Sequence, residues 1–374
     1  MPLTPLEENY GVRTLSGLVQ LYAGQRLTNR NLQNRFFNAR RMAPNPGGDT
    51  VEWDELQFHR HLAPIVGADS PHPILEGMTS VLRSATPAHV KTSVVLRASE
   101  LLQQRAPGST APDGGRMLRD QRLQDAVTTV TNTIEYLAAS ALVGTITVNN
   151  TNIPGTTLPF TVSFSPNTGT AAATWATAST DHLADVTAAK LDFFQSCNLQ
   201  PADVIMGNTI QGYLQNSAQL QTLLAPTIGD QVARGASRLF GPLFDGFQLA
   251  GLNWEINEAF YVPQGGVVTR FLSATDKLVM LPGASDLPQV LAMVEGRGIT
   301  PSAGPDVLGA MIGADGMVSL DGEGLFSEVG PGWYAWAERT RHDAQDMGVK
   351  INVGWCGLPV LLQPGAVLVH DTVP

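Results

Sequence analysis

The chain has 374 residues, of which 43% are apolar and only 15% are charged, against a usual charged share of about 25%. Its net charge is −10, but residues 1–122 hold 14 basic and 11 acidic side chains, so the remainder carries about −13. An acidic body argues against general nucleic-acid binding, and the absence of a run of about 20 apolar residues argues against a membrane span.

Residues 1–47 are rich in arginine and show little hydrophobic pattern. Their only acids are Glu7 and Glu8, against the arginines Arg13, Arg26, Arg30, Arg35, Arg40 and Arg41. Arginine suits fixed ion pairs at interfaces because its planar guanidinium binds a carboxylate at two points. Two interpretations stay open: a flexible tail, or an arm that becomes ordered on an acidic neighbour.

Residues 48–98 alternate in the manner of strands, for example at Val51–Trp53 and Val90–Leu96, on either side of a loop at Gly67–Pro73. The pattern predicts a long two-stranded excursion. An isolated hairpin is marginal in water, so this one needs a partner surface on its own chain or on a neighbour.

The clearest element is a helix predicted over 116–143. Its apolar residues are spaced 4, 3, 4, 3 and 4 apart, at Leu123, Val127, Val130, Ile134, Leu137 and Ala141. Gly144 is expected to end it, giving a rod of roughly 40 Å. No charged residue occurs from Tyr136 to Thr180, and the pieces TITV and FTVSF within this stretch predict a hairpin.

The remainder reads as short helices and strands. A second helix should carry Val186, Ala189, Phe193 and Cys197 on one face, and 203–207 (DVIMG) should form a buried strand. Asn208 is expected to cap a further helix that runs to Leu224. Several strands follow in 239–282, and the segment LPVLL–QPGA–VLVH predicts a closing hairpin with Pro364 and Gly365 at its turn.

Candidate chemistry is sparse. His59 and His61 are two residues apart, so on a strand both would face one side and could share a metal ion with His72 or Glu55. The favoured interpretation is that they are surface or interface histidines, with no metal. Neither the group at His342 nor the acids of 313–324 match a known catalytic or calcium motif.

The same absence extends to cofactors. No nucleophile elbow, phosphate-binding loop or dinucleotide fingerprint occurs, so neither an enzyme activity nor a cofactor is expected. Cys197 and Cys356 are predicted to be buried free thiols. The opening MPLTPLEENYG lacks the regions of a signal peptide, and a soluble protein is expected.

The order of elements resembles the major capsid proteins of tailed phages, which share the Hong Kong 97 fold. More narrowly, it resembles the lambda-type family, phage major capsid protein E. The segments that carry the resemblance are Met117–Val148, Thr161–Asn167, Val204–Leu224, Gly251–Val262 and Arg341–Val367. The likeness covers most of the chain from about residue 30, and 283–332 matches least.

The resemblance implies an α+β fold with five parts. They are an N-terminal arm (1–47), an extended loop or E-loop (48–98), a peripheral P-domain with a spine helix (99–202, helix 116–143), an axial A-domain (203–330) and C-terminal strands that return to the P-domain (331–374). The implied function is a major capsid protein that self-assembles, as hexamers and pentamers, into the icosahedral head of a tailed bacteriophage. The head would enclose double-stranded DNA without reading its sequence.

The same resemblance implies partners and contacts. A decoration protein, a scaffold and a portal are expected, with assembly in the host bacterial cytoplasm and a final place in the virion. The residues expected to contact neighbouring subunits are Arg30, Arg35, Arg40, Arg41, Trp53, His59 and His61. Some relatives join a loop lysine to a neighbour's asparagine, and Lys91 with Asn352 is the pair that could do so here; reinforcement by a decoration protein is preferred.

Two alternatives stay open. One is an encapsulin-like shell of the same fold, which would hold cargo enzymes. The other is a metal-dependent hydrolase that uses His59, His61 and His72.

Overall fold

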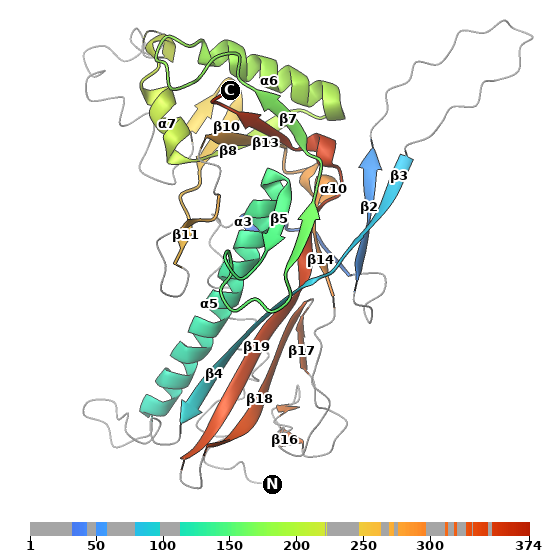
Figure 1. The fold of residues 1–374 in the computed structure, drawn as a ribbon, viewed down its shortest axis with the longest axis vertical. Helices are drawn as coiled ribbons and strands as arrows, with labels where there is room; N and C mark the ends of the chain where they lie inside the picture. Colours follow the sequence, from blue (N-terminus) through green and yellow to red (C-terminus); the bar gives the residue numbers. More distant parts are fainter. Residues whose placement is uncertain are drawn as a thin grey trace, which may run out of the picture.

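A computed structural model describes the chain in segments. They are residues 32–42, 50–57, 79–97, 113–220, 222, 247–262, 269–272, 276–296, 311–312, 318–319, 327–330, 332–342 and 346–374. The described residues form an elongated molecule with a long sheet and helix at one end and a second, helix-covered sheet at the other (Figure 1). A two-stranded ribbon stands beside the second lobe and leads away from the body.

The long sheet is mixed and is built from six described strands. Its path runs β1 (Arg40–Met42), β14 (Leu291–Glu295), β19 (Asp346–Leu361), β18 (Trp333–His342) and β17 (Ser327–Gly330), with β4 (Ala88–Arg97) also paired to β19. β4 and β14 occupy successive parts of one edge of β19, and β18 lies along its other edge. Such a long central strand lets distant segments share one sheet.

The predicted long helix is confirmed as α5 (Asp113–Val143), which packs against β4 and β19. Its six predicted core residues are all buried, from Leu123 to Ala141. Gly144 follows with φ +102°, a conformation that favours glycine, and a Cβ there would meet the Pro166 ring at 2.8 Å. The predicted hairpin comes next as β5 (Thr145–Val148) and β6 (Phe160–Ser163).

The second sheet also has six described strands, and α6 (His182–Cys197) and α7 (Asn208–Gln215) cover it. Its order is β7 (Asn167–Thr170), β20 (Leu368–Asp371), β13 (Lys277–Pro282), β8 (Pro201–Met206), β10 (Leu252–Ile256) and β9 (Phe247–Leu249). The predicted apolar face of α6 and the predicted buried strand β8 are confirmed. Shorter described elements are α10 (Leu287–Val290), β11 (Phe260–Tyr261), β12 (Thr269–Arg270), β15 (Met311–Ile312) and β16 (Val318–Ser319).

The prediction for the helix after β8 was wrong at both ends. Gly207 occupies the N-cap position, and α7 ends at Gln215 rather than Leu224. The N-cap position has no side-chain cap bond, and the backbone N–H of Asn208 donates to the Glu258 carboxylate at 2.5 Å. A carboxylate from a distant loop therefore satisfies the helix terminus that the sequence appeared to satisfy locally.

The predicted two-stranded excursion exists, but with a different second strand. β2 (Val51–Gln57) pairs with β3 (Thr79–Ala85), not with the Val90–Leu96 strand. That strand is β4, which joins the long sheet opposite β19. Alternation shows that a segment is extended, but it does not say which strand lies beside it.

The predicted closing hairpin was also wrong. β19 and β20 belong to different sheets, and a short 3-10 turn (Pro364–Ala366) carries the chain from one to the other. Ser196 of α6 donates to the Gly365 carbonyl at 2.8 Å and so fixes this turn. Strand pairing thus crosses the expected part boundaries: β14 pairs in the long sheet, and β20 in the second. The assignment of residue ranges to peripheral and axial parts stays a prediction.

Candidate functional site

The first part of the site is the attachment of residues 32–42, here called the arm segment. It holds α3 (Leu32–Arg35) and β1, and β1 pairs in parallel with β14. Leu32, Phe36 and Phe37 are at most 1% exposed, so the segment is anchored in the core. Burying three large apolar side chains contributes about 1.5–3 kcal/mol each.

Two carboxylates on the body receive the segment. Glu135 of α5 accepts hydrogen bonds from the backbone N–H groups of Leu32 (2.7 Å) and Gln33 (3.1 Å). Burial raises the pKa of Glu135 to about 7, although the two backbone bonds act in the opposite direction. Glu295 of β14 pairs with Arg40, and burial raises its pKa to about 7 as well, against the lowering effect of Arg40.

Arg35 reaches the second lobe. Its guanidinium pairs with Glu255 of β10 and lies 3.4 Å from the Asp203 carboxylate of β8. It also stands 5.0 Å from the centre of the Phe36 ring. Arg41 has a weaker contact, donating to the Pro288 carbonyl at 3.4 Å. The arm segment therefore contacts α5, both sheets and α10, and so it connects the two lobes.

The second part is the β2–β3 ribbon. One of its faces packs on the body: Trp53 is 7% exposed and lies 6.1 Å from the Phe164 ring, and Glu55 bonds to Arg83 at 3.0 Å. The other face is open, with Leu82 65% exposed opposite Asp54. This open face leaves a large apolar side chain in water, where a contact with another surface could cover it.

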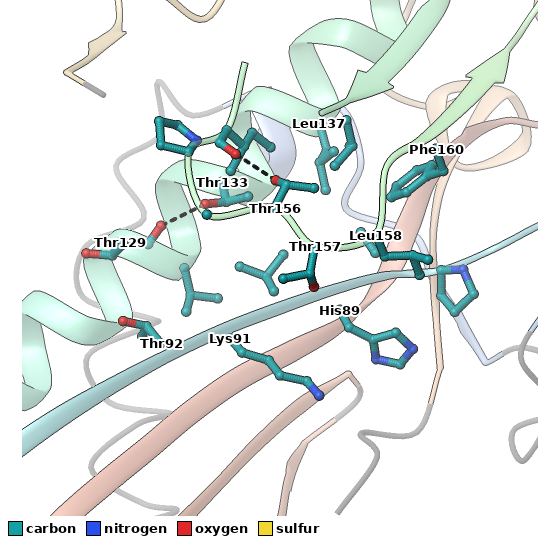
Figure 2. A pocket seen from close by; sticks show the side chains of 18 residues that line it. His89, Lys91, Thr92, Thr129, Thr133, Leu137, Thr156, Thr157, Leu158 and Phe160 are labelled. Atoms are coloured by element: carbon teal, nitrogen blue, oxygen red, sulfur yellow. Dashed lines mark hydrogen bonds between the residues drawn. The ribbon is translucent and has the colours of Figure 1, made fainter. Parts of the chain in front are cut away.

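The third part is a groove of about 470 Å³ between α5, β4 and the β5–β6 connection (Figure 2). Threonines and apolar residues dominate its lining, among them Thr129, Thr133, Leu137 and Leu158. His89 and Lys91 extend from β4 on the side away from α5. With no acidic side chain in its lining, the groove suits an apolar segment better than a cationic ligand.

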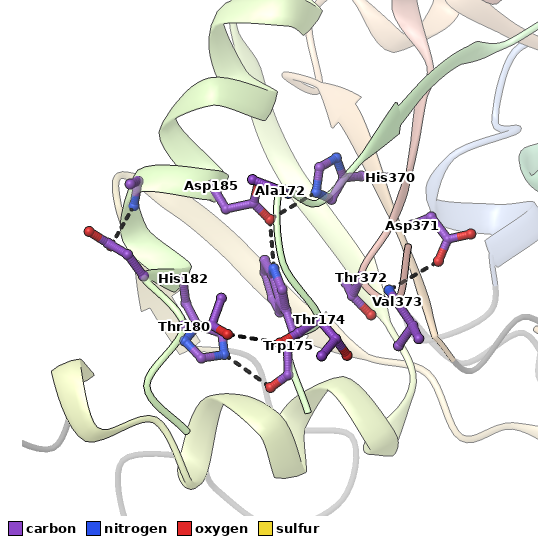
Figure 3. Close-up of polar contacts among 12 residues, drawn as sticks. Ala172, Thr174, Trp175, Thr180, His182, Asp185, His370, Asp371, Thr372 and Val373 are labelled. Atoms are coloured by element: carbon purple, nitrogen blue, oxygen red, sulfur yellow. Dashed lines mark hydrogen bonds and ion pairs between the residues drawn. The ribbon is translucent and has the colours of Figure 1, made fainter. Parts of the chain in front are cut away.

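A polar cluster holds the second lobe together (Figure 3). Asp185 of α6 accepts from Trp175 Nε1 at 2.6 Å and lies 3.1 Å from His370 Nε2 of β20. His182 bonds to the Trp175 carbonyl at 3.2 Å and to Ser217 at 3.0 Å. His182 and Ser217 are fully buried and His370 is 3% exposed, so a substrate could not reach them. Their hydrogen bonds hold α6, β20 and the segment at Trp175 together.

Residues 25–291, well over half of the chain, match the family model described as phage major capsid protein E. The chain belongs to the phage major capsid protein E family. It is therefore a shell-forming capsid protein, and the expected Hong Kong 97 fold and capsid function are confirmed. No curated protein matches the sequence.

One solved structure supports the fold. The putative capsid protein of a prophage of Escherichia coli CFT073 is 12% identical, with a TM-score of 0.56 and coverage of 96% of this chain and 99% of that one. The capsid of Myoviridae phage XM1 is 11% identical, with a TM-score of 0.43 and coverage of 91% and 92%. An encapsulin complex of Synechococcus elongatus PCC 7942 is 11% identical, with a TM-score of 0.41 and coverage of 93% and 89%.

The capsid protein's predicted contact residues divide into two groups. Arg35, Arg40, Arg41 and Trp53 are described, and the contacts given above for all four lie within the chain. Their role between subunits stays a prediction. Arg30, His59, His61 and His72 lie outside the described residues.

The proposed lysine–asparagine pair occupies one sheet of a single chain. Lys91 lies opposite Gly354 and Asn352 lies opposite Ser93, on the adjoining strands β4 and β19. Asn352 is 8% exposed, which leaves it little access to a neighbour. Both cysteines are free and buried, as predicted. In the described part of the chain, no three His, Cys, Asp or Glu side chains are placed to share a metal ion, and no described helix is long and apolar enough to cross a membrane.

The sequence reasoning missed Glu135 and Glu295. A signal for Glu135 was present, since Thr131, Glu135, Ala138 and Leu142 form a second helical stripe beside the apolar one, and all four are buried. An acid inside such a stripe indicates a buried partner. Glu295 closes the strand LAMVE and has no comparable local signal.

Proposed function

We propose that this capsid protein builds the icosahedral head shell of a tailed bacteriophage, as hexamers and pentamers, around double-stranded DNA. The family match over residues 25–291 carries the proposal. The acidic net charge supports a container that encloses DNA without binding it tightly, because tight binding to the phosphate backbone requires a basic contact surface. We infer further that the role is structural and needs neither catalysis nor a cofactor.

Assembly in the host cytoplasm, and partnership with a scaffold, a portal and a decoration protein, form part of the same proposal. They rest on the family alone. Arg35 and Arg40 would then serve assembly indirectly, by holding the arm segment on the body.

The subunit contact that we propose joins the open face of the β2–β3 ribbon to the groove of a neighbouring copy. Leu82 is the apolar side chain offered, and the groove lined by Leu137 and Leu158 is the surface that receives it. One face of the ribbon packs on the body, and its open face carries Leu82 65% exposed. Burial of this side chain between copies would contribute about 1.5–3 kcal/mol at each contact.

Electron microscopy of the purified chain, with light scattering for mass, tests the proposed function. Closed shells of megadalton mass are expected, either from the chain alone or on co-expression with a scaffold. A monomer or dimer that persists under both conditions would contradict the proposal. DNA-filled heads, rather than protein-filled shells, would separate a phage head from an encapsulin-like container.

A further inference from the structure

The arm segment meets an unusual number of buried acids. Four carboxylates from four elements face it: Glu135 of α5, Asp203 of β8, Glu255 of β10 and Glu295 of β14. Their residues are 3%, 9%, 8% and 1% exposed. A carboxylate removed from water in this way is costly unless it is paired or protonated.

The positive charge supplied by the segment does not balance these acids. Arg35 serves both Asp203 and Glu255, and Arg40 serves Glu295. Glu135 receives only backbone N–H groups, and Arg41 donates to a carbonyl instead of an acid. Four carboxylates thus face two guanidinium groups, an excess of two negative charges in a buried place.

The other groups around these acids do not remove the excess. Asn253 donates to Asp203 and is neutral. The Cys356 thiol lies near Glu295, and burial raises its pKa to about 11, so it stays a neutral thiol that does not balance the acids. Lys91 and His89 of β4 lie close to the Cys356 thiol, and His89 Nε2 is 4.0 Å from its sulfur atom. Around Glu135, the groups described are the N–H donors of Leu32 and Gln33.

We propose that docking of the arm segment takes up protons, so that the body holds residues 32–42 more tightly in mildly acidic than in alkaline solution. The acids that take up these protons are Glu135 and Glu295, the two whose pKa burial raises from 4.5 to about 7. In the docked state they hold protons between about pH 4.5 and 7, whereas in the undocked, hydrated state they release them. Docking is therefore strongest below pH 4.5 and weakens as the pH rises through 7.

Hydrogen exchange measured by mass spectrometry on the full-length chain tests this proposal. The protection of peptides from 32–42, corrected for intrinsic exchange rates, is compared at about pH 5.5 and about pH 8. When the pH rises from about 5.5 to about 8, the protection of the 32–42 peptides should fall by roughly tenfold to thirtyfold for each of the two carboxyls, Glu135 and Glu295. A peptide from the buried part of α6 serves as the internal reference, and its corrected protection should change much less.

Three substitutions assign the effect. Glu295→Gln replaces a carboxyl by a neutral group whose amide oxygen can still accept from Arg40, so it should raise the protection of 32–42 at about pH 8. Glu135→Gln keeps only one of the two oxygens that accept from Leu32 and Gln33, so it should lower the protection at about pH 5.5 and reduce its change with pH. The double variant should remove most of the pH dependence. Asp125→Asn is the matched control, because Asp125 lies on the same helix as Glu135 but is exposed, and it should behave as the unmodified chain.

Two results would overturn the proposal. One is protection that is independent of pH or that increases toward alkaline pH. The other is loss of protection in E295Q at both pH values, which would mean that the ionised Glu295 carboxylate holds the arm segment. Because every contact involved lies within one chain, the outcome does not depend on whether the chain forms a shell.

Discussion

Single residues in β19 show how closely the long sheet is packed. Gly354 lies opposite Tyr334 on β18, and a Cβ at Gly354 would come within 2.3 Å of the tyrosine ring. Tyr334 is 2% exposed, so its ring has little freedom to move away, and burial raises the pKa of its hydroxyl. Gly212 in α7 is the opposite case, since a Cβ there would meet nothing within 4 Å.

The substitution Gly354→Ala should therefore lower the free energy of unfolding by about 1–3 kcal/mol, the usual cost of overpacking a core. Gly212→Ala should raise it by about 0.5–1 kcal/mol, because alanine is the better helix former. Denaturant unfolding of unassembled subunits measures both. Equal effects of the two substitutions would show that the close approach to Tyr334 does not constrain position 354.

At the scale of elements, β20 is an interior strand of the second sheet, so its removal should destabilise the whole second lobe. It lies between β13 and β7 in the sheet, and His370 bonds to Asp185 of α6. Just beyond it, Thr372 donates its backbone N–H to the Asp276 carbonyl at 3.0 Å. A strand that completes the interior of a sheet leaves two rows of unpaired backbone groups when it is removed.

Deletion of residues 368–374 should therefore prevent the second lobe from folding cooperatively, whereas deletion of 373–374 should have little effect because both residues are exposed. Soluble yield and the sharpness of thermal unfolding compare the two truncations. If the longer truncation unfolded as sharply as the intact chain, β20 would be an accessory strand and not part of the core.

At the scale of the whole molecule, the described surface leaves several large apolar side chains exposed to water. Leu82 on the β2–β3 ribbon is 65% exposed and Leu158 at the groove is 59% exposed, while Leu191 of α6 and Phe260 of β11 are also more than half exposed. A lone exposed apolar residue is ordinary, but one on a projecting ribbon and another at a groove are complementary features of one chain. Assembly of copies would cover both.

Leu82→Asp and Leu158→Asp should each reduce the yield of shells by at least tenfold while leaving the subunit folded, because both side chains are already in water and a buried carboxylate would oppose contact. Leu191→Asp on α6 is the matched control, because Leu191 is 56% exposed and lies outside the proposed contact, so this variant should assemble normally. Light scattering and circular dichroism separate assembly from folding. A normal yield with L158D alone would remove the groove from the proposed contact but keep Leu82; a normal yield with L82D would reject the contact.

Much of the secondary structure could be predicted because its signals are local. The stripe from Leu123 to Ala141 predicted α5, and the apolar face from Val186 to Cys197 predicted α6. The predictions failed where partners are distant in the chain. The pairing of β4 with β19 and the placing of β20 in the second sheet had no local signal, since alternation is the same whichever strand lies alongside.

The sequence by itself determined the kinds of elements, their order and, through its resemblance to a known family, the capsid function. Only the tertiary structure decided which strands share a sheet, that Arg35 and Arg40 have partners within the chain, and that Glu135 and Glu295 are buried beneath the arm segment. The physical reason is the distance along the chain between the residues that interact. Helix and strand patterns arise from neighbours a few residues apart, whereas the burial of a charge depends on surfaces joined from residues 102 or more positions away, as for Gln33 and Glu135.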